Sequence, residues 1–184
     1  MSARVGERPR RERLRPPAHT SRFLEVATLR DAAAVAALRC ATADRLTAEH
    51  GEGPWSGQTS ATGMRSAMAR AVVYVHRERG AIVATFALSP RKPWAIDPAY
   101  FTAARVPLYL TSMAVRPDRQ RAGLGRRCMR ELPRIARDWG ADAVRLDAYD
   151  APAGAGGFYA ACGMRESGRV VYRRAPLVYY EWVA

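Results

Sequence analysis

The sequence predicts one domain of the mixed α/β (α+β) class, and three observations support that prediction. Apolar, β-prone runs such as residues 108–115 alternate with stretches whose apolar residues recur at helical spacing, such as residues 124–139. The chain has 184 residues, of which 48% are hydrophobic, and this length suits one core better than two. No apolar run approaches the ~20 residues that a membrane helix needs, so we expect no membrane partner.

The first residues differ in composition from the rest of the chain. Residues 1–22 hold seven arginines and several prolines with almost nothing apolar, so we expect them to form a disordered basic tail ahead of a folded domain at residues 23–184. A net charge of +13, carried almost entirely by arginine, suits a polyanionic cofactor and also nucleic acid. A weak tether for nucleic acid or a protein partner is therefore the alternative interpretation of the tail.

The first half of the domain is expected to hold strands and two helices before an irregular loop. We expect Met64 and Met68, four residues apart on the second helix, to pack in the core, and His76 to lie at the rim of a strand rather than to act as a catalyst. The expected elements are a strand at 24–28, a helix from Asp31 toward His50, a break at 51–57, a helix reaching about Arg70, and strands at 72–76 and 82–88.

Residues 90–101 are too rich in proline for regular structure and too aromatic for an idle linker. Loops that hold several aromatic residues usually cover something. The segment is either a packed surface loop or a wall of a binding pocket, and in the second case its pocket residues are Trp94, Asp97, Tyr100 and Phe101.

The second half continues with a helix and a strand after residues 108–115. Leu124, Cys128, Leu132, Ile135 and Trp139 recur at helical spacing, and Pro133 inside that helix predicts a kink or a break. The next strand, residues 143–148, alternates between two faces. We expect Val144, Leu146 and Ala148 on one face, and Arg145, Asp147 and Tyr149 on the other.

A glycine-containing turn joins the apolar strand at 108–115 to the following helix. Glycines at 123 and 125 let the backbone approach a ligand, and the unpaired N–H groups of a first helical turn favour an anion. The spacing matches neither the P-loop nor the Rossmann glycine pattern. It does match Gln/Arg-x-x-Gly-x-Gly/Ala through Gln120, Gly123 and Gly125.

This turn resembles the pyrophosphate loop of the GNAT superfamily of acetyl-CoA-dependent N-acetyltransferases. A second motif supports the resemblance, because residues 158–164 are similar to the Phe-Tyr-x-x-x-Gly-Phe end of the GNAT helix beside the CoA thiol, with Met164 for the last aromatic. One usual asparagine contact is replaced by Asp150-Ala151-Pro152. The resemblance implies the GNAT fold: a mixed, mostly antiparallel sheet of about seven strands with helices on both faces.

The resemblance also implies the cofactor and its contacts. Acetyl-CoA would be the acetyl donor, and backbone N–H groups of the splayed central strand would grip its pantetheine arm and thioester oxygen. Carried over by motif position, the cofactor-binding residues are Met113, Val115, Gln120, Arg121, Ala122, Gly123, Leu124, Gly125 and Arg126.

Amide formation needs an acid for the departing thiolate and a base for the incoming ammonium. By resemblance Tyr159 is placed to donate the proton, although a buried core tyrosine is its structural alternative. An aliphatic amine with pKa ~10.4 is mostly protonated at neutral pH, so a proton must be accepted. We expect water relayed toward Asp147 to do this, with Glu166 and Asp97 as the carboxylates next in line.

The helix–loop–helix region would overhang the acceptor site of such an enzyme, which makes Trp55 and Glu52 candidates for substrate contact. The expected activity is N-acetylation of the primary amine of a small molecule in a ternary complex. The alternatives are a protein N-acetyltransferase, which would show an open groove, and, more remotely, a non-catalytic basic module for nucleic acid.

Three cysteines without metal-ligand spacing favour the reducing cytoplasm and no metal. The apolar strand at 177–183 offers an edge for a homodimer.

Overall fold

The computed structural model describes residues 21 and 23–184, so the predicted basic tail at residues 1–22 lies almost entirely outside the described residues. The described chain forms a seven-stranded sheet in the order β1-β2-β3-β4-β5-β7-β6, in which only β4 and β5 pair in parallel. The strands are β1 (Glu25–Val26), β2 (Val72–Glu78), β3 (Ala81–Ser89), β4 (Pro107–Val115), β5 (Ala143–Tyr149), β6 (Arg165–Tyr172) and β7 (Ala175–Val183). This is the predicted fold class.

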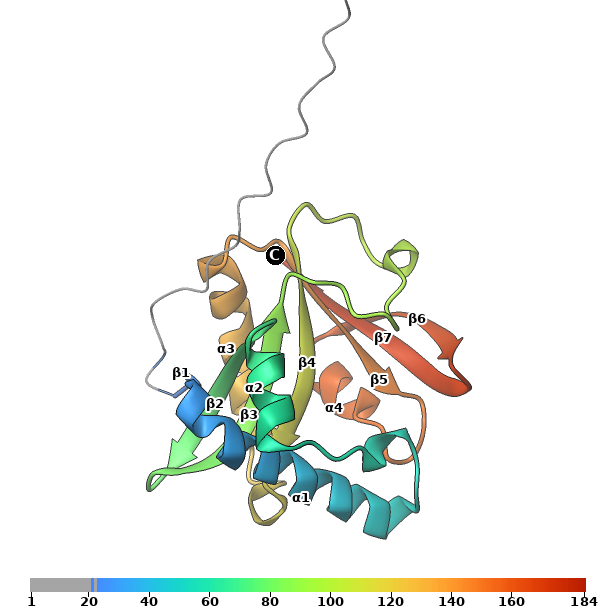
Figure 1. Cartoon of the computed structure of the whole chain (residues 1–184). Coiled ribbons are helices and arrows are strands. Elements are labelled where there is room, and N and C mark those ends of the chain that lie inside the picture. Colours follow the sequence, from blue (N-terminus) through green and yellow to red (C-terminus); the bar gives the residue numbers. More distant parts are fainter. Residues whose placement is uncertain (1–20, 22) are drawn as a thin grey trace, which may run out of the picture.

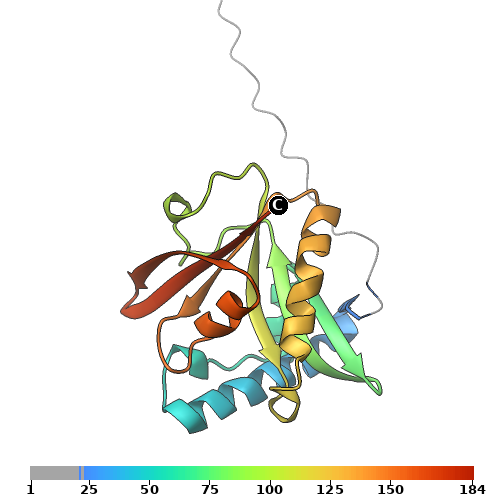
Figure 2. The same ribbon diagram turned by 180° about the vertical axis from the view of Figure 1, so that it is seen from behind.

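Helices cover both faces of the sheet. On the face turned to the viewer in Figure 1 lie α1 (Ala32–His50) and α2 (Ala61–Met68), and Figure 2 shows α3 (Leu124–Asp138) and α4 (Gly156–Ala161) on the other. Each face has its own apolar core. Tyr74, Phe86 and Leu146 pack under α3, whereas Val73 and Val75 pack under α1 and α2 together with the predicted core residue Met64.

The alternation predicted for β5 is present in the structure. Val144, Leu146 and Ala148 are buried in the core under α3. Arg145 faces the opposite side, where its guanidinium lies 5.0 Å from the centre of the Phe101 ring. The side chains of Asp147 and Tyr149 share this second face, which puts both beneath α1 rather than beneath α3.

One expectation needs correction, and one alternative of another is excluded. The strand predicted at 177–183 is not an edge strand, because β7 pairs with β5 along one side and with β6 along the other, so both of its backbone edges are occupied by this chain itself. Pro133 does not divide its helix, since α3 runs unbroken from Leu124 to Asp138. Proline removes one backbone bond, and the buried neighbours Leu132 and Ile135 hold the helix on the sheet across that gap.

None of the helices within the described part of the chain combines the length and the hydrophobicity that a bilayer crossing requires. His76, expected at the rim of a strand, stacks on Phe23 with ring centroids 3.9 Å apart, and its Nδ1 lies 2.7 Å from the Phe23 carbonyl oxygen. This histidine therefore fastens the start of the domain to β2 and takes no part in the pocket described next.

Candidate functional site

The site arises where the two parallel strands of the sheet separate. β4 and β5 pair only at Pro107–Ala143, Leu108–Val144 and Tyr109–Arg145, and beyond these three pairs their facing edges have no strand partner in the described chain. Strand pairing normally satisfies both edges of an inner strand. The separation therefore leaves backbone donors and acceptors of two adjacent strands facing one another across a gap, visible between β4 and β5 in Figure 1.

A β-bulge shapes the β4 side of this gap. The register between β3 and β4 shifts opposite Phe86, and Ser112 has a positive φ of 57°, which is uncommon for a residue with a side chain. Beyond the bulge the Arg116 N–H donates to the Val83 carbonyl on β3 at 2.9 Å. Backbone groups alternate along a strand, so those of Val115 face the open edge, where its carbonyl accepts from Gln120 Nε2 at 3.0 Å.

A pocket of about 410 Å³ fills the space between the separated strands and α1. Leu110 to Ala114 of β4 form one wall, Asp147 to Tyr149 of β5 another, and Tyr159 of α4 closes the base. A further wall comes from α1 and the segment at 53–57, with the lining residues Arg39, Thr42, Ala43, Leu46, Pro54, Trp55 and Gly57, and the loop before α4 contributes Ala153 and Ala155.

The segment that carries Trp55 is tied to β5 on one side and to α1 on the other. The Tyr149 hydroxyl donates to the Pro54 carbonyl at 3.1 Å, and the rings of Trp55 and Tyr149 meet edge to face with centroids 6.0 Å apart. Thr47 of α1 donates to Ser56 at 2.7 Å, which fixes the other side of the segment. Trp55 therefore lies where a substrate-contact residue was expected, while Glu52 is exposed and does not line the pocket.

Replacing Tyr149 by phenylalanine should loosen this tie without unfolding the domain. The ring contact with Trp55 survives, but the hydrogen bond to Pro54 is lost, so the unfolding free energy should fall by no more than about 1 kcal/mol. Hydrogen exchange should become faster at the backbone amides of residues 53–57 and stay unchanged in β2. Equal protection of that segment in both proteins would contradict the proposed tie.

Asp147 stands on the pocket wall without a basic partner among the described residues. Burial raises the pKa of its carboxyl above the ordinary value, opposed only by its own backbone N–H. Glu166 is exposed and pairs with Arg169 at 2.8 Å, and Asp97 accepts from the Ala99 N–H at 3.0 Å on a distant loop. Asp147 is thus the one carboxylate on the lining of this pocket.

Tyr159 lies beside Asp147 at the base of the pocket and is 6% exposed. Burial raises the pKa of its phenol well above the usual range, and the Asp147 carboxylate raises it further. The hydroxyl is therefore protonated at every physiological pH and is available as a hydrogen-bond donor. The higher pKa also makes Tyr159 a weaker acid than an exposed tyrosine, which limits it to proton donation toward a group that is strongly basic when it leaves.

The glycine turn lies outside the pocket lining, on exposed surface at the start of α3. The first backbone bond into the helix runs from the Arg127 N–H to the Gly123 carbonyl at 3.0 Å, so the N–H groups of Leu124, Gly125 and Arg126 have no helical acceptor. Gln120, Arg121 and Ala122 are exposed just before them. This end of a 15-residue helix presents donors and positive charge to an anion.

The two glycines of the turn serve different purposes. Gly123 has φ +80°, a left-handed conformation that side-chain-bearing residues avoid, and a Cβ there would meet nothing within 4 Å. Gly125 has an ordinary conformation, but a Cβ would lie 3.1 Å from the Phe158 ring. Gly125 therefore lets α3 pack against α4, which joins the turn to the helix that carries Tyr159.

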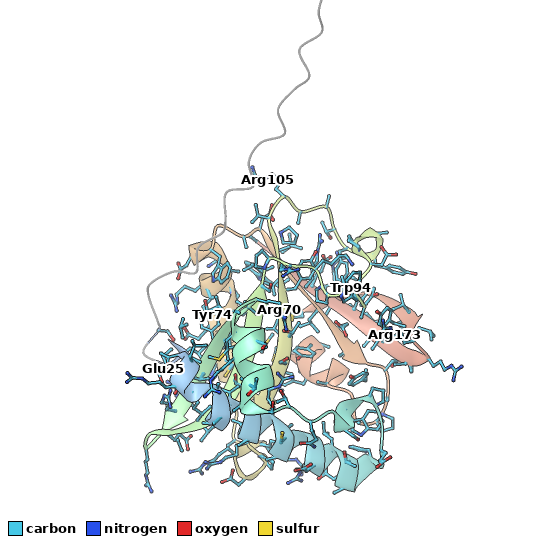
Figure 3. All side chains as sticks on the ribbon, viewed as in Figure 1. Glu25, Arg70, Tyr74, Trp94, Arg105 and Arg173 are labelled. Carbon is cyan, nitrogen blue, oxygen red and sulfur yellow. The ribbon has the colours of Figure 1, made fainter. Side chains whose placement is uncertain are left out.

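The structure brings only part of the predicted acceptor set together. Trp55 lines the pocket, whereas none of the four loop residues does. Phe101 stacks on Tyr179 with centroids 5.2 Å apart, and Tyr100 meets the same ring edge to face at 5.6 Å. Trp94, labelled in Figure 3, is 89% exposed. The backbone N–H of Asp97 donates to the Tyr179 hydroxyl at 3.2 Å, which fixes this residue at β7, away from the pocket. The loop thus covers β7, not the pocket.

Sequence reasoning overlooked one charged residue of the pocket, Arg39. It follows Val35 by four residues and precedes Leu46 by seven, so it belongs to the same stripe of α1 as these apolar residues. The sequence feature that could have predicted Arg39 as a pocket residue is its position within the apolar stripe of an otherwise alanine-rich helix.

Comparison with known proteins agrees with this geometry. A model of the acetyltransferase (GNAT) family matches residues 31–164 of the chain. A search of curated protein sequences finds no match. Among solved structures, the ribosomal-protein-alanine N-acetyltransferase of Brucella melitensis is similar over 88% of this chain and 99% of its own, with 18% identity and a TM-score of 0.65.

Two further solved structures share the fold. A putative acetyltransferase of Salmonella typhimurium, yncA, determined with its cofactor acetyl-CoA, covers 87% of this chain and 92% of its own at 17% identity and TM-score 0.62. An aminoglycoside 6'-acetyltransferase type Ii covers 88% and 96% at 13% identity and TM-score 0.63. At these identities the similarity establishes the fold.

Proposed function

Because the chain belongs to the GNAT acetyltransferase family, a group of acyltransferases that use acetyl-CoA, we propose that it acetylates the primary amine of a small molecule. The observation that supports this most strongly is the pocket between β4 and β5, whose lining includes a carboxylate and a buried phenol, together with the helix N-terminus that follows β4. These groups offer a proton acceptor, a hydrogen-bond donor and an anchor for a phosphorylated cofactor.

The residues present fit acetyl-CoA. We assign its pyrophosphate to Gln120, Arg121, Ala122, Gly123, Leu124, Gly125 and Arg126, because the helix there has unpaired N–H groups and no acidic side chain in its first turn. Backbone N–H groups of Met113 and Val115, on the edge that β5 leaves open, would hold the pantetheine arm and the thioester carbonyl. The bound cofactor supplies an acetyl thioester.

Two side chains on the pocket lining would have separate tasks in the reaction. Asp147 accepts a proton from the incoming ammonium, directly or through water, because its raised pKa makes it a better base than an ordinary aspartate. Tyr159 would donate a hydrogen bond that stabilises the departing thiolate, and its raised pKa keeps the proton on the phenol. Burial raises the pKa of Cys128 to about 12, and neither Cys128 nor Cys162 lines the pocket, which favours direct transfer over a cysteine-bound acetyl group.

A small acceptor is favoured because the segment at 53–57 forms one wall of the pocket and is held there by the Tyr149–Pro54 bond, whereas a polypeptide would need a long open groove. The similar structures include enzymes named for a ribosomal protein and for aminoglycosides, so the fold itself does not decide between acceptors. Reduced thiols and the need for acetyl-CoA lead us to place the activity in the cytoplasm.

The test is thermal melting with and without acetyl-CoA, followed by thiol release in the presence of a panel of amines. Acetyl-CoA at ~100 times its dissociation constant should stabilise the fold by about 2.7 kcal/mol. Thiol release should depend on the amine and should yield one amide per thiol. The absence of a melting shift at any cofactor concentration would overturn the proposal.

A further inference from the structure

Arg39 is a charged group of the pocket to which the proposed chemistry gives no task. It projects from α1 into the pocket, alongside Thr111 and Ser112 at the bulge of β4. Within residues 21 and 23–184 it has neither a carboxylate within 4.0 Å nor a hydrogen-bond acceptor. Burial lowers the pKa of its guanidinium, and no carboxylate of the described residues counteracts this effect.

Other arginines of the described chain that are withdrawn from solvent have partners. Arg77 donates to Asp31 at 2.7 Å and also to Glu25, and Arg145 donates through Nη2 to the Thr102 carbonyl at 2.7 Å, although its Nε has no acceptor. A guanidinium has five N–H donors, and removing it from water without acceptors is costly. An oxyanion bound in the cavity would therefore provide the hydrogen-bond acceptors that a half-buried arginine facing that cavity lacks.

The pocket thus presents opposite charges on different walls. Arg39 stands on the α1 wall and Asp147 on the β5 wall of the same space of about 410 Å³. A ligand that satisfies both walls carries a cationic nitrogen and an anionic group within one small molecule.

We propose that the acceptor amine also bears an oxyanion, a carboxylate or a phosphate, which Arg39 binds while the amine faces Asp147. This inference rests on the proposed acetyltransferase function and narrows its substrate class to amino acids and similar zwitterions. Arg39 selects the acceptor and takes no part in the bond changes, so its removal should discriminate between acceptors instead of slowing all of them.

The experiment compares pairs of acceptors with and without the anionic group, and kcat/KM is referred to the uncharged amine, because loss of the anionic charge also lowers the pKa of the amine. The probes are the common amino acids beside their carboxamides, for the carboxylate, and O-phosphoethanolamine beside ethanolamine, for the phosphate. Each is assayed by thiol release with the wild type, Arg39→Met and Arg39→Lys. Arg45→Met is the control, because Arg45 lies on the same helix and pairs with Glu49 at 2.5 Å outside the pocket.

The wild type should prefer the anionic member of at least one pair. Which pair shows the preference identifies the recognised group as a carboxylate or a phosphate. Arg39→Met should reduce kcat/KM for that member by about 10- to 100-fold, chiefly through KM, and leave its neutral counterpart within about threefold. Arg39→Lys should recover part of the loss, and Arg45→Met should behave as the wild type.

Three results would overturn the inference. Equal turnover of both members of every pair by the wild type would show that no anion is recognised, and an equal loss for both members in Arg39→Met would give Arg39 a general role. A melting shift with acetyl-CoA but no turnover of any anionic probe would exclude this substrate class while leaving the acetyltransferase function standing. The absence of that shift would remove both.

Discussion

Replacing Asp147 by asparagine is expected to lower kcat by about 10²- to 10⁴-fold while making the folded protein more stable at neutral pH. The loss of rate follows from removing the one carboxylate on the lining of the pocket in the described chain. In the wild type, kcat should fall as the pH drops through the raised pKa of Asp147, and this acidic limb should be absent from the variant.

The gain in stability has a definite sign. Burial raises the pKa of Asp147, so the folded protein holds this proton more tightly than the unfolded chain does. Its stabilising contribution is complete below the unfolded-state pKa and is lost as the pH rises through the folded-state value. At pH 7 the wild type carries a poorly hydrated charge that asparagine lacks, and the difference between the two proteins should shrink as the pH falls toward ~4.

Urea denaturation at several pH values and pH–rate profiles measure the two effects together. Glu166→Gln is the control, because Glu166 is an exposed carboxylate paired with Arg169 away from the pocket. A variant that is slower and also less stable at pH 7 would point to damaged folding. An unchanged pH–rate profile would show that Asp147 is not the proton acceptor.

Replacing Gly123 by glutamate should weaken acetyl-CoA binding by at least about 100-fold. A carboxylate at the start of α3 repels the pyrophosphate where the free N–H groups and helix dipole would attract it, and like charges brought together cost several kcal/mol. The added side chain is also strained at φ +80°. The cofactor-dependent melting shift should therefore vanish at concentrations that saturate the wild type.

Gly140→Glu separates the electrostatic effect from the strain. Gly140 has φ +71° and lies just beyond the C-terminal end of α3, and a Cβ there also meets nothing within 4 Å. Both variants should lose a similar amount of intrinsic stability, but only Gly123→Glu should lose the response to acetyl-CoA. Equal responses in the two variants would mean that the cofactor does not bind at this turn.

The parts of the fold that depend on local pattern could be predicted from the sequence. The alternation in β5, the apolar stripe of α3 and the left-handed glycine at its start are each determined by a few neighbouring residues. The separation of β4 from β5 was expected only through a family resemblance, since nothing in residues 107–115 alone shows where pairing with a distant strand ends.

The parts that depend on distant partners could not be predicted in the same way. The aromatic loop was a reasonable pocket wall by composition, but its position is decided by Tyr179 and Glu181, about eighty residues away in the chain. Tyr179 accepts from the Asp97 N–H and Glu181 accepts from the Thr102 N–H and hydroxyl. The order of the strands in the sheet likewise depends on residues far apart in the chain, so the sequence of β7 alone does not show that it lies between β5 and β6.

The short contact between β4 and β5 also has a mechanical consequence. The sheet consists of two groups of strands, β1-β2-β3-β4 and β5-β7-β6, which pair with each other at only three residue pairs, and both groups pack on the core under α3. Beyond these pairs no ladder hydrogen bonds set the distance between β4 and β5 in the described chain. The width of the opening between Met113 and Asp147 is therefore determined by how the side chains pack on either face of the sheet, and not by backbone pairing.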